Sequence, residues 1–255
     1  MKSLAIVGGA GRMGQALGAG LSEASYRVIA LVDVNEPREL FGARYVANLE
    51  ALGSDVPDVV IDFSTPEGVA TSAAWCAEHG VALVVGATGL SSEQRGALEE
   101  AATHVGVVVA SNFSIGAVLQ ERFAAMAAPY FDRVEIIELH HDKKVDAPSG
   151  TSMTTARSIG EARRAAGQRP LVDPTTRQTL PGARGAEGAE GIKIHSVRLP
   201  GLVAHQEVLF GAPGEGLTIR HDSFDRQSFV HGVALALEHI DSSPRLIDGI
   251  SSLIA

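Results

Sequence analysis

The densest group of reactive side chains in the sequence lies in the segment Glu138–Thr151, which holds two histidines, two lysines and two aspartates. Apolar and polar residues alternate along Val134–His141, and this alternation predicts a strand. Side chains two residues apart share a face of a strand, so His140 lies on the face of Glu138 and His141 points to the other. The two histidines therefore have different roles.

A cation and a helix start follow the histidines. Lys144 supplies the cation, and Ser149 followed by Gly150 and Thr151 is typical of the first turn of a helix, whose N–H groups can hold a carboxylate. A proton donor, a cation and an anion cradle within one stretch favour an active site. Three plainer interpretations stay open: a solvated lysine turn, an aspartate that only caps the turn before Pro148, and a metal site. The metal site has no third ligand at suitable spacing.

A glycine-rich turn lies at the other end of the chain. The segment Gly8–Gly14 follows the apolar run Leu4–Val7 directly and opens a predicted helix. Glycines allow a tight turn, close approach of a pyrophosphate, and close packing of helix on strand. Asp33 ends the next predicted strand roughly twenty residues later, where an acid meets the ribose hydroxyls of a dinucleotide. The pattern predicts binding of NADH or NADPH.

The choice between these two cofactors stays open in the sequence. Asp33 favours a free 2′-hydroxyl, whereas Arg12 or Arg38 could neutralise a 2′-phosphate. Two further polar turns, Gly86–Gly89 and Ala110–Phe113, follow predicted strands and are expected to line the nicotinamide, because ligands of such sheets lie at the carboxyl ends of the strands.

The first half of the chain must position the glycine turn. Near-continuous apolar runs predict buried parallel strands, and helical patterns separate them. Strands are expected at 4–7, 27–32, 59–61, 81–85 and 107–109, and helices at 13–24, 66–79 and 91–104. The fold class is therefore α/β, with a Rossmann-like doubly wound parallel sheet.

The residue pattern of the second half predicts a smaller α+β domain with a mixed β-sheet. Alternation predicts strands at 134–141, 192–199, 206–210 and 217–221; helical patterns occur at 115–128, 151–166 and 225–240, and a long mobile loop is expected at 181–191. We expect residues 1–111 and 225–255 to form the dinucleotide-binding domain and 112–224 to form the substrate-binding and oligomerisation domain.

Composition excludes several classes of protein. The formal net charge of the 255 residues is −9, which argues against binding to nucleic acid. The single cysteine, Cys76, excludes an internal disulfide. No apolar run approaches the ~20 residues of a membrane span, and the N-terminal apolar stretch is too short for a signal peptide. We expect a cytoplasmic protein with no membrane or nucleic-acid partner.

The chain resembles the dihydrodipicolinate reductases of lysine biosynthesis, also described as 4-hydroxy-tetrahydrodipicolinate reductases. The most specific block is Glu138–Thr151, which fits ELHHxxKxDAPSGT. Val7–Gly14 (VGGAGRMG), Asp62–Pro66 (DFSTP), Asn112–Gly116 (NFSIG) and Val197–Gly201 (VRLPG) resemble further blocks of that family. The likeness covers essentially the whole chain.

The resemblance implies roles for individual residues. His140 aligns with the family's proton donor or acceptor and Lys144 with its catalytic proton donor, while His141, Gly150 and Thr151 align with substrate-binding positions. The aligned cofactor positions are Gly8, Gly9, Ala10, Gly11, Arg12, Met13, Asp33, Gly86, Ala87, Thr88, Ala110, Ser111, Asn112 and Phe113. The resemblance also implies a small cyclic dicarboxylate as substrate, NADH or NADPH as cofactor, no metal, and a homotetramer built through the second sheet.

Two positions depart from the family's usual pattern. Ala87 stands where a second threonine is usual and Ser111 where proline is usual, so nicotinamide affinity or coenzyme preference could differ.

Two other functions remain as alternatives. One is another NAD(P)-dependent dehydrogenase of amino-acid metabolism, such as an aspartate-semialdehyde type, for which Cys76 is poorly placed as nucleophile. The other is a non-catalytic NAD(P)-sensing module, which the intact His140 and Lys144 argue against.

Overall fold

The structure is a computed structural model that describes residues 1–24 and 26–254. The chain divides into two compact units, one formed by Met1–Ile115 together with Arg226–Ala255 and the other by Gly116–Asp225. The first unit is thus assembled from both ends of the chain, and the second is one continuous stretch between them.

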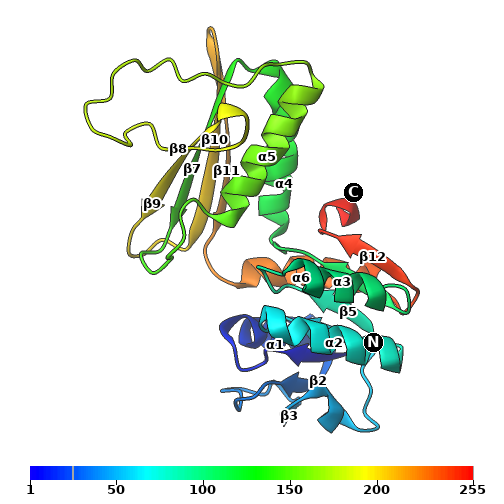
Figure 1. The fold of residues 1–255 in the computed structure, drawn as a ribbon. Coiled ribbons are helices and arrows are strands. Elements are labelled where there is room, and N and C mark those ends of the chain that lie inside the picture. The colour runs from blue at the N-terminus through cyan, green and yellow to red at the C-terminus, as the bar shows by residue number, and fades with distance from the viewer. Residues whose placement is uncertain (25, 255) are drawn as a thin grey trace. The chain divides into compact units, whose positions relative to one another are not determined.

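A seven-stranded sheet forms the centre of the first unit (Figure 1). In spatial order its strands are β12 (Arg245–Asp248), β6 (Gly106–Val109), β5 (Ala82–Val85), β4 (Val59–Asp62), β1 (Ser3–Val7), β2 (Arg27–Val32) and β3 (Arg44–Val46). Every neighbouring pair is parallel. The order runs outward in both directions from β1 and β4, so the predicted doubly wound parallel sheet is confirmed.

Helices cover both faces of this sheet. They are α1 (Arg12–Glu23), α2 (Pro66–His79), α3 (Ser92–Ala101) and α6 (Gln227–His239), with short 3-10 turns η1 (Leu49–Leu52) and η4 (Ser251–Leu253). The helices α2 and α3 share a buried cluster with one face of the sheet, for example with Ala5 and Val107. The opposite face is equally buried at Leu4 and Ile6, and α1 and α6 contact each other. Burial on both faces explains the continuous apolar runs of the strands.

The helix α2 begins as its sequence predicts. Thr65 is the N-cap residue, its hydroxyl oxygen accepts a hydrogen bond from the Gly68 N–H at 3.4 Å, and Pro66 occupies the first turn. Two edge strands, β3 and β12, were not predicted. They are three and four residues long and partly exposed, so their apolar pattern is too short to be recognised.

The second unit contains a five-stranded mixed sheet. Its order is β11 (Glu215–Ser223), β10 (Ala204–Ala212), β7 (Arg133–His140), β9 (Lys193–Arg198) and β8 (Ala186–Glu187). Strands β7 and β9 run parallel, and the other neighbours are antiparallel. This confirms the predicted mixed sheet.

Two helices, α4 (Ile115–Ala127) and α5 (Gly150–Ala165), lie on the same face of this sheet (Figure 1). Alternate strand residues such as Ile136 and Val208 pack with Ala156 and Ile159 in one buried cluster. A short 3-10 turn, η2 (Ala128–Tyr130), ends α4. The remaining residues of each strand face away from the helices.

The predicted irregular loop at 181–191 is wrong in part. Strand β8 lies within it and pairs with β9, and the 3-10 turn η3 (Ala189–Gly191) follows. Arg184 forms ion pairs with Glu135 and with Asp173, the latter at 3.4 Å. Glycine and alanine dominate the segment, so no local pattern indicated the strand or the ion pairs.

Among the described residues, none of the helices combines the length and apolarity that a membrane span requires.

Candidate active site

The sequence-predicted cofactor residues gather at one edge of the first sheet. Gly8, Asp33, Gly86 and Ala110 directly follow β1, β2, β5 and β6. Since these strands are parallel members of one sheet, their carboxyl ends lie along the same edge. This is the edge at which open α/β sheets bind their ligands.

The glycine turn is shaped for close approach. Gly8 has φ +80°, which favours glycine. A Cβ on Gly14 would lie 2.2 Å from the Gly8 carbonyl oxygen, and one on Gly9 would lie 2.8 Å from Leu31 Cβ. The first turn of α1 therefore packs against the turn from β1 at a distance that only glycine permits.

The start of α1 offers an anion site of the kind that a pyrophosphate needs. Gly11 is the N-cap residue and supplies no side-chain cap, and the first turn contains no acidic residue. N–H groups at a helix start, together with the helix dipole, favour a phosphate. The turn therefore fits the phosphates of a dinucleotide. Arg12 is exposed in this first turn, and Met13 beside it is half-buried.

Asp33 is fixed against the glycine turn. One of its carboxylate oxygens accepts a hydrogen bond from the Ala10 N–H at 3.0 Å, and the other accepts one from the Asn35 N–H at 3.0 Å. Each oxygen keeps acceptor capacity for a further donor. The carboxylate is therefore placed beside the phosphate site with its orientation set by backbone groups.

A cavity of about 570 Å³ adjoins this carboxylate. Its lining includes the predicted Gly8, Gly11 and Asp33, and also residues that the sequence did not single out: Asn48, Glu50, Ser72 and Trp75. Trp75 stacks on His79, with ring centroids 4.1 Å apart, and its buried indole N–H has no partner among the described residues. In sequence Trp75 looks like an ordinary apolar residue of a helix, so no signal marked it.

The other predicted nicotinamide segments pack around Phe63. A Cβ on Gly86 would lie 2.1 Å from the Phe63 ring, which explains the glycine. Phe113 is 1% exposed and its ring lies 5.5 Å from that of Phe63, so its side chain belongs to the core. Asn112 accepts a hydrogen bond from the Ser114 N–H at 2.8 Å and shapes the turn. Of the remaining positions, Ala87 and Ala110 are buried, Ser111 and Thr88 are exposed.

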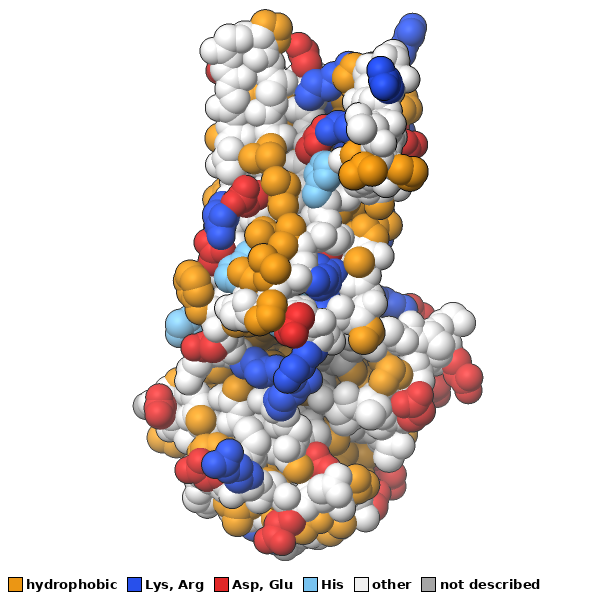
Figure 2. Space-filling model, turned by 90° about the vertical axis from the view of Figure 1, so that its left-hand side faces the viewer, with side chains coloured by type: hydrophobic (Ala, Val, Ile, Leu, Met, Phe, Trp, Pro, Cys, Tyr) orange, Lys and Arg blue, Asp and Glu red, His pale blue; other side chains and the backbone are white. Residues whose placement is uncertain are grey.

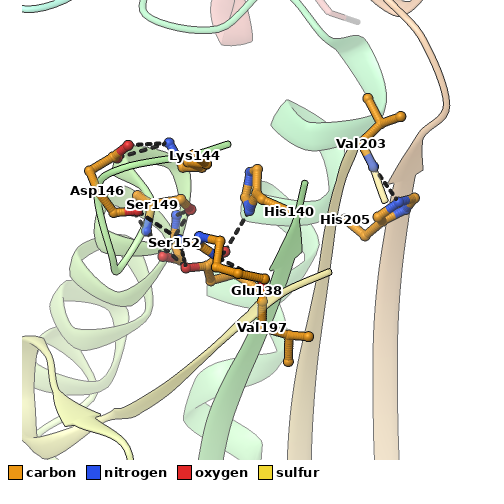
Figure 3. Close-up of polar contacts among 10 residues, drawn as sticks. Glu138, His140, Lys144, Asp146, Ser149, Ser152, Val197, Val203 and His205 are labelled. Carbon is orange, nitrogen blue, oxygen red and sulfur yellow. Dashed lines mark hydrogen bonds and ion pairs between the residues drawn. The ribbon is translucent and has the colours of Figure 1, made fainter. Parts of the chain in front are cut away.

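In the second unit, His140 and Glu138 lie side by side on β7 (Figure 3). Their side chains form a hydrogen bond of 2.5 Å between His140 Nδ1 and Glu138 Oε2. This agrees with the shared strand face that period two predicts. His141 follows the end of β7, and its buried Nδ1 has no hydrogen-bond partner among the described residues.

Lys144 lies in the turn after β7. Its ammonium group donates to both carboxylate oxygens of Asp146, at 2.7 and 2.8 Å (Figure 3). Asp146 is more exposed than Lys144, and its pKa is lowered chiefly by the hydrogen bond from that lysine. The neighbouring Lys143 is exposed. The two lysines therefore differ, and only Lys144 is held in place by a carboxylate.

The predicted anion cradle begins α5. Ser149 is the N-cap residue, and its hydroxyl oxygen accepts a hydrogen bond from the Ser152 N–H at 3.2 Å. Gly150 and Thr151 are the first two residues of the helix, and the first turn contains no acidic side chain. This helix start can hold a carboxylate for the same reason that α1 can hold a phosphate.

Sequence reasoning missed one partner of this group, Arg198 on β9. Its guanidinium donates to both oxygens of Glu138, each at 2.8 Å. Burial would raise the pKa of Glu138, but hydrogen bonds from His140, Arg198 and Ser196 outweigh it and lower the pKa to about 2. Glu138 is therefore an anion at neutral pH. The VRLPG block contained Arg198, but nothing in the sequence pairs it with a residue sixty positions earlier.

Cys76 cannot serve as an exposed nucleophile. It is fully buried in α2, and its burial, together with the charge of Asp62, raises the pKa of the thiol. Thiol-dependent dehydrogenase chemistry requires an accessible, readily ionised cysteine. The aspartate-semialdehyde type of enzyme therefore finds no nucleophile here.

A doubly wound sheet with this glycine turn and acid, joined to a mixed-sheet unit with a histidine and lysine site, defines an NAD(P)H-dependent oxidoreductase. Residues 2–113 match the family model of the dihydrodipicolinate reductase N-terminus, and residues 116–253 match that of its C-terminus. The chain belongs to the dihydrodipicolinate reductase family.

Individual relatives are similar to this chain along its full length. The 4-hydroxy-tetrahydrodipicolinate reductase of Enterococcus faecalis is 45% identical over 263 residues, with all of both chains covered. That of Cutibacterium acnes is 46% identical over 258 residues, covering 100% of this chain and 99% of the relative. Among solved structures, dipicolinate-bound dihydrodipicolinate reductase from Paenisporosarcina sp. TG-14 is 40% identical, with a TM-score of 0.87 and full coverage of both chains.

Proposed function

We propose that this chain catalyses the reaction for which its relatives are named, the reduction of 4-hydroxy-tetrahydrodipicolinate by NADH or NADPH in lysine and diaminopimelate biosynthesis. In the balanced reaction the substrate loses its 4-hydroxyl group as water and gains a hydride at that carbon. One proton is consumed, and tetrahydrodipicolinate and oxidised cofactor are released. The observation that carries the proposal is the histidine of β7, held by a buried carboxylate in the same segment as Lys144 and the start of α5.

The second unit is proposed to bind the substrate. His140 serves as proton donor or acceptor and Lys144 as proton donor, while His141, Gly150 and Thr151 hold the two carboxylates. Three features support this assignment. Among the described residues the buried Nδ1 of His141 has no hydrogen-bond partner, and the first turn of α5 contains no acidic side chain. The ammonium group of Lys144 is held by an exposed carboxylate, which a substrate can replace. Charge-assisted hydrogen bonds of this kind are the strong ones.

The first unit is proposed to bind the dinucleotide. A bound reduced nicotinamide supplies the hydride. The residues that would hold the cofactor are the turn Gly8–Met13, Asp33, and the segments Gly86–Thr88 and Ala110–Phe113, which share the carboxyl edge of the sheet. Phe113 would contribute through its backbone, because its side chain is buried.

NADH is proposed as the preferred cofactor. Among the described residues that line the cavity beside Asp33, none is lysine or arginine, and two are the carboxylates Asp33 and Glu50. A 2′-phosphate needs a cation such as arginine, whereas an acid at this position accepts hydrogen bonds from the ribose hydroxyls. Val34, rather than a basic residue, follows Asp33.

The assembly is proposed to be a cytoplasmic homotetramer joined through the open face of the second sheet. Residues that alternate with the helix-facing ones supply an apolar strip made of Ile137, Leu139, Val197 and Leu209. Figure 2 shows hydrophobic side chains gathered along this side of the unit. Copies of the same strip can cover one another, as a symmetric interface requires.

The proposal is tested by a coupled assay in which substrate is formed from aspartate semialdehyde and pyruvate, with NADH and NADPH in parallel. Positioned acid–base groups contribute ~10²–10⁴-fold to rate, so His140→Ala and Lys144→Ala should each lower kcat by about that factor. Binding of NADH, followed by fluorescence of Trp75 in the cofactor cavity, should stay largely unchanged.

The neighbouring Lys143→Ala is the matched control, because Lys143 is exposed in the same turn, and it should keep the wild-type kcat. Near-normal kcat in both His140→Ala and Lys144→Ala would refute the assignment of these residues. Absence of any substrate-dependent oxidation of either cofactor by the wild-type protein would refute the function and favour a non-catalytic NAD(P)-sensing module.

A further inference from the structure

The carboxylate of Glu138 is the centre of the polar group in the second unit. Its side chain is 0% exposed. It accepts hydrogen bonds from Nδ1 of His140 and from the two terminal nitrogens of the Arg198 guanidinium. It also accepts one from the Ser149 N–H at 3.2 Å. A buried carboxylate with this many donors is held in a single orientation.

The contact with His140 sets the position of a proton. Glu138 is ionised and can only accept hydrogen bonds, so Nδ1 of His140 must be the protonated nitrogen. In the neutral ring the lone pair then resides on Nε2, the nitrogen that Glu138 does not touch.

Arg198 also contacts the turn after β7 that carries Lys144. Besides binding Glu138, its guanidinium donates to the carbonyl oxygen of Asp146 at 2.7 Å. The carboxylate of Asp146 in turn holds the ammonium group of Lys144. Through Ser149, Glu138 also contacts the N-cap of α5. One buried ion pair thus fixes the histidine ring, the lysine turn and the helix start.

We propose that Glu138 and Arg198 are positioning residues for the reduction, which hold His140 with its proton on Nδ1 and fix the turn that carries Lys144. This inference rests on the proposed function. Neither residue is proposed to touch substrate, because the Glu138 side chain is 0% exposed and the guanidinium of Arg198 donates to Glu138 and to the Asp146 carbonyl. A purely structural ion pair would instead be dispensable for turnover as long as the chain folds.

The substitution Glu138→Gln distinguishes a positioning role of Glu138 from a purely structural one. In this variant the amide oxygen of the glutamine can still accept a hydrogen bond from Arg198. The NH₂ group of the glutamine then faces His140. A donor at this place forces Nδ1 to accept, so the proton of the neutral ring moves to Nε2. A histidine in the wrong tautomer cannot take up a proton at Nε2. We expect kcat to fall by about 100-fold, with the affinity for NADH unchanged.

Strand β7 offers a matched control in Glu135. This carboxylate also binds a histidine and an arginine, His195 at 2.8 Å and Arg184, but it lies on the opposite face. We expect Glu135→Gln to keep kcat within about threefold of wild type, because Glu135 faces away from His140 and its partners His195 and Arg184 are not among the proposed site residues. The oligomeric state of each variant is measured alongside, so that a loss of assembly is not mistaken for a loss of positioning.

The tautomer is read directly by ¹⁵N NMR of the histidine side chains, with His140 assigned from His140→Ala. We expect Nδ1–H in the wild type and Nε2–H in Glu138→Gln. A wild-type ring protonated on Nε2, or a Glu138→Gln enzyme with wild-type kcat while His140→Ala is inactive, would overturn the proposal and leave the proposed function standing. Full activity of His140→Ala would refute the role proposed for His140, whereas a wild-type protein without substrate-dependent cofactor oxidation would refute the proposed function.

Two conservative variants decide the outcome if Glu138→Gln does not fold. Glu138→Asp keeps the charge but withdraws the carboxylate from the ring, and Arg198→Lys keeps the charge but cannot bind both oxygens. Both should lower kcat at least tenfold with far-UV circular dichroism and NADH affinity like those of the wild type. Wild-type kcat in both would overturn the proposal.

Discussion

Asp33 is oriented by two backbone N–H groups, those of Ala10 and Asn35, rather than by another side chain. Its direction is therefore set by backbone groups, one of which belongs to the glycine turn. The same turn places the start of α1 beside it, so one short stretch of backbone sets both of the positions that we propose to hold the ribose and the phosphates of the dinucleotide. Changing the side chain at position 33 should alter which ribose is accepted without moving that backbone.

We expect the double variant Asp33→Ser, Val34→Arg to prefer NADPH. Removal of the carboxylate relieves its repulsion of a 2′-phosphate, and the arginine supplies the missing cation. The ratio of kcat/KM for NADH to that for NADPH should fall by at least tenfold, whereas KM for the dicarboxylate should not change. A wild-type enzyme that already prefers NADPH would contradict the proposed coenzyme choice.

At this scale the sequence predicted the residue types but not their partners. His140 and Lys144 stand out because their spacing is dense, and period two places Glu138 on the face of His140. The contact with Arg198 depends on the parallel pairing of β7 with β9, which no local pattern reveals. Likewise Trp75 lines the cavity beside Asp33 because α2 packs against β4, so its position in the helix pattern alone gave no indication.

At the scale of elements, the buried ion pair joins β7, β9 and the start of α5. Strands β7 and β9 are adjacent in the sheet, and His140 pairs with Arg198 in their register. Ser149, whose N–H donates to Glu138, caps α5. A single carboxylate therefore ties three elements together, and its ionisation is linked to the stability of the fold.

We expect this linkage to appear as acid destabilisation. The pKa of Glu138 is about 2 in the folded chain against an ordinary 4.5, so its stabilising contribution is complete above pH 4.5 and is lost as the pH falls toward 2. The shift corresponds to about 3 kcal/mol in total, of which about 2 kcal/mol is lost by pH 3. Urea unfolding at pH 6 and pH 3, at fixed protein concentration, measures it.

The comparison that isolates Glu138 is the difference between wild type and Glu138→Gln. Other carboxylates with lowered pKa, such as Asp58 and Asp222, destabilise both proteins on acidification and cancel in the difference. The variant should lose less free energy of unfolding between the two pH values. An equal loss in both proteins would show that Glu138 is not the group whose protonation matters.

Elements with long or strongly periodic patterns were predictable, and short ones were not. The five central strands of the first sheet are apolar on both faces, and all were predicted from that property. The edge strand β3 buries one side chain and β12 buries none, so backbone pairing rather than pattern defines them. Strand β8 within the predicted loop is two residues long and has both side chains exposed.

At the scale of the whole molecule, the second sheet of the described chain carries the helices α4 and α5 on one face and none on the other. Its other face presents Ile137, Leu139, Val197 and Leu209 as half-buried side chains. Self-association through this strip is the arrangement that the proposed homotetramer requires, since it would remove the apolar side chains from water.

We expect light scattering to give the mass of a tetramer for the wild type. Leu209→Glu places charges in the strip and should yield smaller species, because an unpaired charge is costly to bury. Val56→Glu, on an exposed part of the first unit, is the control and should leave the mass unchanged. A wild-type protein that is monomeric at assay concentration would refute the assembly.

The return of the chain to its first unit has a consequence for biosynthesis. Strand β12 completes the edge of the first sheet beside β6, and α6 packs its Val230 against Gly20 of α1, so the last thirty or so residues hold parts of the nucleotide-binding half. On the ribosome, the middle stretch has all of its own strands before these arrive. The unit that is translated first is therefore the unit that is completed last, and a nascent chain released before α6 and β12 would contain the whole second unit yet lack part of the first sheet.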